Sequence, residues 1–186
     1  MMRIITGKAR GIKLNTLEGE ATRPTAERIK EAVFSKLQFD IEGRKILDLF
    51  SGSGQLALEA LSRGASEATL IDNSPEAIKI IRENANKTKL LDSCRIYKAD
   101  ALDYIKRNKG ELFDIVFLDP PYASQLYTLV LNALIEFDML KATSIIVCES
   151  DREIFDDKIK EKYEIVKTNK YGKTIITFAV PVIKEK

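Results

Sequence analysis

The sequence predicts an α/β domain with a mostly parallel sheet of seven strands and helices on both faces of that sheet. Three observations support this prediction. From residue 45 onward, short apolar runs alternate with stretches of helical periodicity, which is typical of a parallel sheet. Several of these runs end in an acid or in a glycine-rich turn. The last two runs are too close together for a helical crossover, so we expect them to pair antiparallel.

The expected elements follow one another regularly. Seven runs are predicted to be strands, at residues 46–50, 68–71, 94–97, 113–118, 144–148, 163–167 and 174–180. Helices are expected at residues 54–63, 75–88, 101–107, 125–137 and 153–160. Gly64 provides a stop for the first of these helices, and Ser74 followed by Pro75 provides a start for the second.

The N-terminal region precedes this alternation. Residues 3–6 and 12–14 are predicted to be two short strands of a β-hairpin, joined by a glycine-flanked turn at residues 7–11. This turn would present Lys8 and Arg10 to solvent.

A helix is expected after the loop that follows the hairpin. Thr25 is a suitable N-cap for it, and Ile29, Val33 and Leu37 repeat on one helical face. We therefore expect two parts, a basic β-hairpin extension at residues 1–22 and a main domain at residues 23–186.

The composition excludes several kinds of chemistry. The 186 residues include no histidine, which removes Ser/His and Cys/His nucleophiles and any histidine-based zinc site. Cys94 and Cys148 lie in apolar, strand-like surroundings and are expected to be reduced, without a bound metal. No run is long enough to cross a membrane, and no signal-like apolar region opens the chain. We expect a cytoplasmic protein that works with carboxylates, backbone groups and a bound cofactor.

Charge is distributed unevenly along the chain. The net charge is only +2, but residues 1–36 hold eight basic and four acidic side chains. A local excess of this kind favours a contact surface for a polyanion, with a solvated basic segment as the alternative. The basic side chains are Arg3, Lys8, Arg10, Lys13, Arg23, Arg28, Lys30 and Lys36.

The ends of the first three strands of the main domain predict a site for an adenosine-bearing ligand. The first strand leads into a glycine loop at residues 48–54, which lets a ligand approach the backbone closely. The second ends in Asp72, which can accept the hydroxyls of a ribose. Asp100 follows the third and can bind an adenine amine. A helix-capping or surface role is the alternative for each acid.

The glycine loop also fits the relaxed dinucleotide pattern G-x-G-x-x-A, but only weakly. Asp48 and Ser51 place polar groups ahead of the glycines, where a pyrophosphate would prefer bare N–H groups. An acid beside the ligand disfavours a diphosphate and suits a cationic sulfonium or an amino group. An NAD oxidoreductase is therefore the less favoured interpretation.

A second site motif, Asp119-Pro120-Pro121-Tyr122, follows the apolar run at residues 115–118. Two prolines cannot continue a β-ladder, so the backbone must turn out of the sheet with a stiff shape. The Asp119 carboxylate and the Pro120 carbonyl can accept the two N–H groups of an exocyclic amine while the Tyr122 ring stacks on the base. A plain strand-terminating turn is the alternative.

These motifs together resemble a known family. The segment 47–54, then Asp72, Asp100 and the segment 119–122, resemble motifs I to IV of class I S-adenosylmethionine-dependent methyltransferases that methylate amino nitrogens. The segments nearer the two ends of the chain resemble the RsmD family in particular: Arg3-Ile4-Ile5-Thr6-Gly7, Arg10-Gly11, Arg23-Pro24-Thr25 with Arg28, and Tyr171-Gly172. The chain departs from the family pattern at Asp72, Gln55 and Ala9.

The resemblance implies a Rossmann-like class I methyltransferase fold. It also implies transfer of a methyl group from S-adenosylmethionine to the N2 amine of a guanine in bacterial 16S rRNA, within the small ribosomal subunit or its assembly intermediate. No metal and no membrane are expected to take part, and a monomer is expected.

The resemblance also assigns roles to individual residues. The cofactor-binding set is Asp48, Phe50, Ser51, Gly52, Gly54, Asp72, Asn73, Asp100, Ala101 and Asp119. The catalytic set is Asp119, Pro120, Pro121 and Tyr122. The RNA-binding set, in which Lys8 and Lys13 are included because of the local charge excess, is Arg3, Lys8, Arg10, Lys13, Arg23, Thr25 and Arg28.

Two further functions remain open on the sequence alone. The D-P-P-Y motif also suits adenine N6, so an amino-methyltransferase of another RNA or of DNA is possible. The second is a non-catalytic RNA-binding module for ribosome assembly that kept the fold.

Overall fold

The computed structural model describes residues 2–18, 24–120 and 124–183. A single seven-stranded sheet has the order β3-β2-β1-β4-β5-β7-β6. The strands are β1 (Lys45–Asp48), β2 (Glu67–Asp72), β3 (Cys94–Lys98), β4 (Phe113–Leu118), β5 (Leu140–Ser150), β6 (Tyr163–Tyr171) and β7 (Thr174–Pro181). Strands β1 to β5 pair parallel, whereas β7 pairs antiparallel with both β5 and β6. The expected sheet is therefore confirmed.

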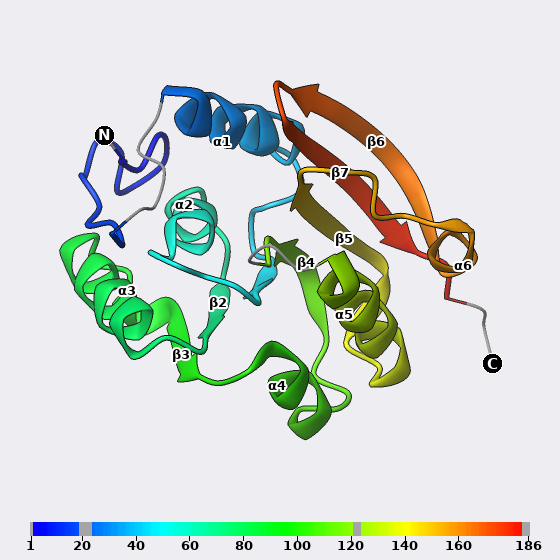
Figure 1. The fold of residues 1–186 in the computed structure, drawn as a ribbon. Coiled ribbons are helices and arrows are strands. Elements are labelled where there is room, and N and C mark those ends of the chain that lie inside the picture. Colours follow the sequence, from blue (N-terminus) through cyan, green and yellow to red (C-terminus); the bar gives the residue numbers. More distant parts are fainter. Residues whose placement is uncertain (1, 19–23, 121–123, 184–186) are drawn as a thin grey trace.

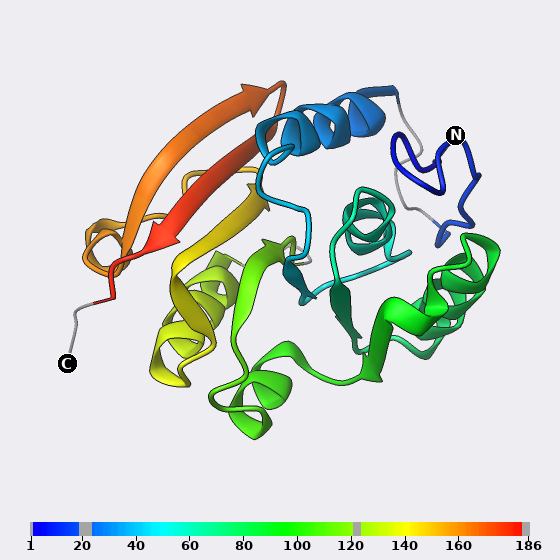
Figure 2. The same ribbon diagram turned by 180° about the vertical axis from the view of Figure 1, so that it is seen from behind.

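Helices cover both faces of the sheet (Figures 1 and 2). They are α1 (Pro24–Lys36), α2 (Gln55–Ser62), α3 (Pro75–Lys87), α4 (Ala101–Arg107), α5 (Ser124–Glu136) and α6 (Asp157–Lys160), with a short 3-10 turn at Leu91–Ser93. Side chains of α1, α2 and α3 share one hydrophobic core, and those of α4, α5 and α6 share the other.

The apolar runs of the central strands follow from this three-layer arrangement. In β4, Ile115 and Phe117 point into the core under α1 and α2, while Val116 and Leu118 point into the core under α4 and α5. Because successive side chains of a strand alternate between faces, a strand covered on both sides must be apolar throughout.

The helix starts are mostly as the sequence predicts, with one correction. The Ser74 side chain accepts a hydrogen bond from the N–H of Ala77 (3.3 Å), so the expected cap and the following Pro75 are confirmed. The prediction that Thr25 is the N-cap of α1 is wrong, because α1 already begins at Pro24. The fixed φ of proline suits the first helical position.

The N-terminal segment forms less regular structure than expected. Instead of two strands, residues 2–4 and 12–14 meet at one antiparallel bridge, Arg3 with Lys13. Backbone hydrogen bonds join the two sides, for example from the N–H of Ile4 to the carbonyl of Ile12 (3.0 Å). Beyond the bridge, the N–H groups of Ile5 and Thr6 bond to the carboxylate of Glu59 in α2 (2.7 and 3.0 Å), so they are unavailable for a longer ladder.

A buried ion pair fixes this segment between α1 and α2. Lys30 of α1 lies 3.6 Å from Glu59, and both side chains are almost fully buried. Lys30 also donates to the backbone carbonyl of Arg3 (2.6 Å), and Arg63 donates to Glu59 (2.8 Å). Burial lowers the pKa of Lys30, and the charge of Glu59 opposes this shift. Lys30 is therefore not part of the basic surface in which the sequence analysis had counted it.

The turn of the segment is docked on the end of α2. Gly7 has φ +88°, and a Cβ atom at this position would lie 1.8 Å from the carbonyl oxygen of Ser62. The same carbonyl accepts from the N–H of Lys8 (2.9 Å), and the Ser62 hydroxyl accepts from the N–H of Ala9 (3.0 Å). Only glycine fits at residue 7, because a side chain would push the turn off the helix.

Candidate functional site

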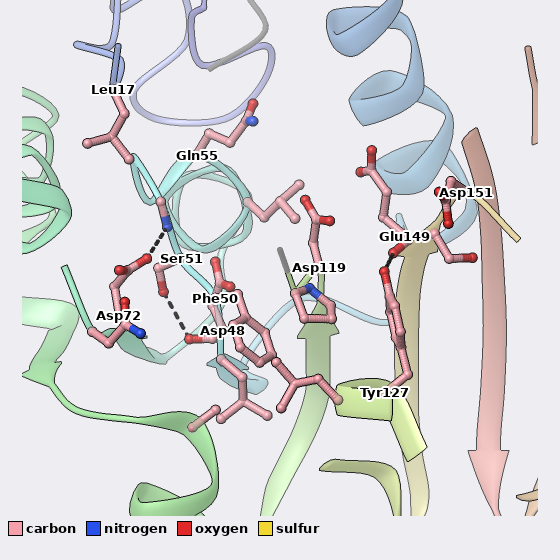
Figure 3. Close-up of a pocket in the computed structure, with 18 of the residues that line it drawn as sticks. Leu17, Asp48, Phe50, Ser51, Gln55, Asp72, Asp119, Tyr127, Glu149 and Asp151 are labelled. Carbon is pink, nitrogen blue, oxygen red and sulfur yellow. Dashed lines mark hydrogen bonds between the residues drawn. The ribbon is translucent and has the colours of Figure 1, made fainter. Parts of the chain in front are cut away.

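The main pocket lies at the carboxyl ends of the strands, where β1 and β4 are neighbours although they are far apart in the chain (Figure 3). Its volume is about 760 Å³. Parallel sheets of this kind bind ligands at such a switch point. The predicted residues that line it are Asp48, Phe50, Ser51, Gly52, Asp72, Asn73, Asp100, Ala101, Asp119 and Pro120.

The charge of the pocket lining is strongly negative. Among the described residues, the lining contains two basic side chains, Arg152 and Lys173. Seven acids face them: Glu18, Asp48, Asp72, Asp100, Asp119, Glu149 and Asp151. Such a lining attracts a cationic ligand and repels a diphosphate. The pocket is thus poorly suited to NAD and well suited to a ligand with a sulfonium and an amino group.

Gly54 differs from the other predicted cofactor residues, because it does not line the pocket. It precedes the first turn of α2 with φ 80°. A Cβ atom there would come within 3.2 Å of Leu70 and 3.4 Å of Ile81. Gly54 therefore shapes the loop and allows α2 to pack closely on β2 and α3, while Gly52 is the glycine exposed to the pocket.

Asp72 connects the glycine loop to the end of β2. Its Oδ2 accepts from the N–H of Gly52 (2.9 Å) and its Oδ1 accepts from the N–H of Ser74 (2.9 Å). Each carboxylate oxygen can accept a further hydrogen bond. Asp72 can therefore hold the loop in place and still accept the two hydroxyls of a ribose.

Asp48 is the most deeply buried acid of the pocket, at 4% exposure. Burial raises the pKa of its carboxyl group to about 7, helped by the nearby charge of Asp72. Hydrogen bonds from the backbone N–H groups of Phe50 and Ala57 oppose that rise in pKa. The Ser51 hydroxyl donates to the Asp48 backbone carbonyl (2.9 Å), which fixes the turn after β1. A cation bound here would stabilise the charged form of Asp48.

Asp100 both caps α4 and faces the pocket. Its Oδ1 accepts from the N–H groups of Leu102 (2.8 Å) and Asp103 (3.1 Å). The helix-capping role that the sequence analysis gave as the alternative for Asp100 is therefore present, and Asp100 and Ala101 also line the pocket.

The proposed catalytic motif begins where β4 ends. Asp119 is exposed to the pocket and Pro120 is buried beside it. Pro121 and Tyr122 lie outside the described residues, so the predicted stacking of Tyr122 on a base stays a prediction. Asp119 lies opposite Asp48 across the pocket in Figure 3, with Phe50 between them and β5 on its other side.

The predicted RNA-binding residues lie outside this pocket. Arg3, Lys8, Arg10, Lys13 and Arg28 are all exposed, on the N-terminal segment and on the neighbouring first turns of α1. Arg3 is paired with Glu27 (2.8 Å), so part of its charge is compensated.

The structure does not describe the side chains of two members of the predicted RNA-binding set. Arg23 lies outside the described residues, and the side chain of Thr25 is not described. The segment reaches the site farther along the chain, because Leu17 and Glu18 line the pocket. The exposed basic residues and the pocket are therefore connected by one short piece of chain.

Known proteins resemble this chain over most of its length. A family model described as conserved hypothetical protein 95 matches residues 2–180. The chain belongs to this family. Ribosomal RNA small subunit methyltransferase D of Escherichia coli (strain K12) is 36% identical over 152 residues, covering 82% of this chain and 76% of that protein. The protein of the same name from Haemophilus influenzae is 34% identical over 154 residues, covering 82% and 80%.

Solved structures agree with this family membership. The Escherichia coli protein yhhF superposes with a TM-score of 0.87 at 28% identity, covering 98% of this chain and 99% of that one. With the sheet order described above, the expected RsmD family membership and the Rossmann-like class I methyltransferase fold are both confirmed.

Several residues of the pocket were not predicted from the sequence, among them Tyr127, Glu149 and Lys173. The Tyr127 hydroxyl of α5 donates to the backbone carbonyl of Glu149 (2.5 Å; Figure 3). Glu149 directly follows a predicted strand, so the strand-end rule that found Asp72 could have found it. No such signal marks Tyr127 or Lys173, because helix and hairpin residues reach the pocket only through the fold.

The described part of the chain contains neither a membrane-spanning helix nor a metal-binding cluster. Within residues 2–18, 24–120 and 124–183, no helix is long and apolar enough to cross a membrane. In the same residues, no three or more His, Cys, Asp or Glu side chains are placed so that together they could hold a metal ion.

Proposed function

We propose that this protein transfers a methyl group from S-adenosylmethionine to the exocyclic N2 amine of a guanine in bacterial 16S rRNA. The observation that carries the proposal is the single acidic pocket that joins Asp48, Asp72, Asp100 and Asp119 at four strand ends. Relatives that share the family are named ribosomal RNA small subunit methyltransferase D, which supports ribosomal RNA as the substrate.

The residues of the pocket fit the proposed cofactor. Asp72 would hold the ribose hydroxyls, Asp100 and Ala101 would lie beside the adenine, and Asp48 would face the cationic part of the ligand. When bound, S-adenosylmethionine supplies an electrophilic methyl group with a good leaving group. The chain itself then has to bind, align and exclude water, and alignment can supply much of a rate enhancement.

Asp119 and Pro120 would act on the amine of the base. The N2 lone pair of guanine is delocalised into the ring, so the amine is a poor nucleophile. Acceptors on its two N–H groups favour the localised form that attacks, and the Asp119 carboxylate and Pro120 carbonyl are the proposed acceptors. As the new N–C bond forms, the nitrogen becomes strongly acidic and loses a proton, so no strong general base is needed. This agrees with a chain that lacks histidine.

RNA binding is assigned to residues 1–22 as an extension of the catalytic domain at residues 23–186. Lys8, Arg10 and Lys13 would contact phosphates, together with Arg23 and Arg28 of the following segment. Such contacts position the RNA without reading its sequence. The target base would leave its stack to enter the pocket. We propose a monomer that acts in the cytoplasm on the small subunit or its assembly intermediate.

The test is tritium transfer from labelled S-adenosylmethionine to small-subunit particles from cells that lack their own enzyme, followed by nucleoside analysis. Labelled N2-methylguanosine in 16S rRNA is the expected product. Label in N6-methyladenosine would keep the mechanism and overturn the choice of base. Binding of the cofactor without any transfer to particles or naked RNA would favour the assembly-module alternative.

A further inference from the structure

The part of the pocket beyond the cofactor residues contains a second carboxylate beside Asp119. Glu149 is the penultimate residue of β5, and Leu118 of β4 is in register with Cys148 of β5. Asp119 directly follows β4 and Glu149 directly follows the paired Cys148, so the two residues come just after the last pair of two strands whose backbones are about 4.8 Å apart. Figure 3 shows both carboxylates pointing the same way, toward the end of the pocket that lies between α1 and α2.

Glu149 is held on a rigid part of the fold. Its backbone carbonyl accepts from the Tyr127 hydroxyl (2.5 Å), and on its other side it is in register with Ile176 of β7. Side chains on ordered strands with such support keep their positions more accurately than side chains on loops. The sheet thus fixes the position of Glu149, while Asp119 is the first residue after β4.

The space next to the two carboxylates is suited to a flat ring. A recess of about 170 Å³ opens beside them, and it shares Gln55, Leu56, Asp119 and Glu149 with the main pocket. The rest of its wall is mostly apolar, with side chains from α1 and from the sheet. A dry apolar cavity of about 150 Å³ is enough to bind benzene, and the opening into the main pocket leaves room for a larger ring system.

The Glu149 carboxylate lines the pocket and can take a hydrogen bond from a ligand there. Burial raises the pKa of Glu149. A donor supplied by a bound ligand would stabilise its charged form.

We propose that Glu149 selects guanine by accepting a hydrogen bond from the ring N1–H of the target base. The inference rests on the proposed function, in which Asp119 accepts from the N2 amine. In guanine the N1–H and the N2 amine are neighbouring donors on one edge, and two neighbouring carboxylates match them. In adenine the ring nitrogen beside the amine is an acceptor, which a carboxylate repels. Glu149 is therefore the residue that distinguishes the two purines.

The experiment separates the N1–H from the amine that is methylated. Small-subunit particles are reconstituted with 16S rRNA that carries either guanine or 2-aminopurine at the methylated position. Both bases have the same exocyclic amine, but 2-aminopurine has no N1–H. Transfer rates are measured with the wild type, with Glu149→Gln and with Glu153→Gln as a matched control. Glu153 is exposed and pairs only with Lys160 at the surface (3.3 Å).

The wild type and the Glu153→Gln control should prefer guanine over 2-aminopurine by about 10- to 100-fold, the value of one hydrogen bond to a charged group. In Glu149→Gln, guanine transfer should fall by a similar factor and the preference should shrink toward one, with cofactor affinity unchanged by calorimetry. Unchanged cofactor affinity also shows that the variant is folded.

Two results would overturn this inference while leaving the proposed function intact. The first is a wild type that methylates N2 of guanine and of 2-aminopurine equally well. The second is a Glu149→Gln enzyme that keeps the full preference of the wild type. Absence of N2-methylguanosine with the wild type itself would instead overturn the proposed function.

Discussion

At the level of single residues, the acids of the pocket differ in how much stability they cost. Asp72 and Asp100 accept backbone hydrogen bonds that also hold loops and helices in place. Asp48 lies out of water, and its raised pKa of about 7 means that folding disfavours its charged form. The charged form of Asp48 therefore costs stability, whereas Asp72 and Asp100 help to hold the fold through these hydrogen bonds.

The change Asp48→Asn tests this cost. In the wild type the pKa of about 7 keeps the carboxyl group protonated after folding up to about pH 7, whereas in the unfolded chain it ionises near its ordinary pKa of 3.8. The free energy of unfolding should therefore fall between pH 4 and pH 7 by a contribution that the variant lacks. Denaturant unfolding of both proteins across this range measures it. A difference in stability that does not change with pH would contradict the assignment.

Asp48→Asn should relieve the loss of stability described above, but it should weaken ligand binding. A cationic ligand prefers the ionised Asp48, so the affinity of the wild type for S-adenosylmethionine should rise as the pH increases from 6 to 8. Asp48→Asn should bind more weakly and show little change over that range. Isothermal titration calorimetry at three pH values measures both trends, and a wild type without pH dependence would be evidence against a role for Asp48.

Asp119 should behave differently from Asp48. Asp119→Ala removes an acceptor of the target amine but leaves the cofactor end of the pocket unchanged, so turnover should be lost while S-adenosylmethionine affinity stays nearly normal. Single-turnover assays and calorimetry on one preparation measure the two effects. Full activity in this variant would remove Asp119 from the mechanism.

At the level of elements, the sequence predicts those strand bounds and helix starts that depend on residues close together in the chain. The apolar run 113–118 has the bounds of β4 as observed, and Ser74 with Pro75 marks the start of α3 correctly. The hairpin extension is predicted only in outline, because its edge bonds to Glu59, a residue more than fifty positions away. The buried pair of Lys30 and Glu59 leaves no pattern in the sequence, since charged residues usually face water.

Gly7→Ala tests the docking of the extension on α2. A Cβ atom would lie 1.8 Å from the Ser62 carbonyl oxygen at a positive φ, so we expect a loss of stability on the order of 3 kcal/mol. Gly11→Ala is the matched control, because φ is similar (+83°) but no atom lies within 4 Å of the added Cβ. Its cost should be only about 1–2 kcal/mol. Equal losses in thermal unfolding would show that steric contact with Ser62 does not matter.

At the level of the whole molecule, positive and negative surfaces are separated. The pocket lining is acidic, whereas the exposed side of the extension carries Lys8, Arg10 and Lys13 without a nearby excess of acids. This separation lets phosphates bind at a distance from the site at which a cationic cofactor binds. The sequence could predict the basic half from its charge count, but the acidic half requires the fold, because its residues come from many strand ends.

The double change Lys8→Ala and Arg10→Ala should weaken RNA binding. If each side chain contacts one phosphate, the slope of log affinity against log salt should become less steep by about 2. Filter binding to 16S rRNA fragments at several salt concentrations measures this slope. Lys106→Ala with Lys158→Ala, on the other side of the sheet, is the control and should leave it unchanged. A slope that stays at the wild-type value in the first variant would exclude these residues as phosphate contacts.

Helix α2 determines how the glycine loop of the pocket and the basic turn of the extension are placed relative to each other. The glycine loop opens into its first turn, and Ser62 at its other end holds the turn of the extension. An eight-residue helix is about 12 Å long and does not bend easily. The same helix therefore fixes the positions of both the glycine loop and the basic turn, one at each of its ends. Lengthening α2 by one residue would rotate the glycine loop relative to the basic turn by about 100° about the helix axis, so a change in the length of α2 would move the cofactor loop and the proposed RNA-binding turn out of their present relation.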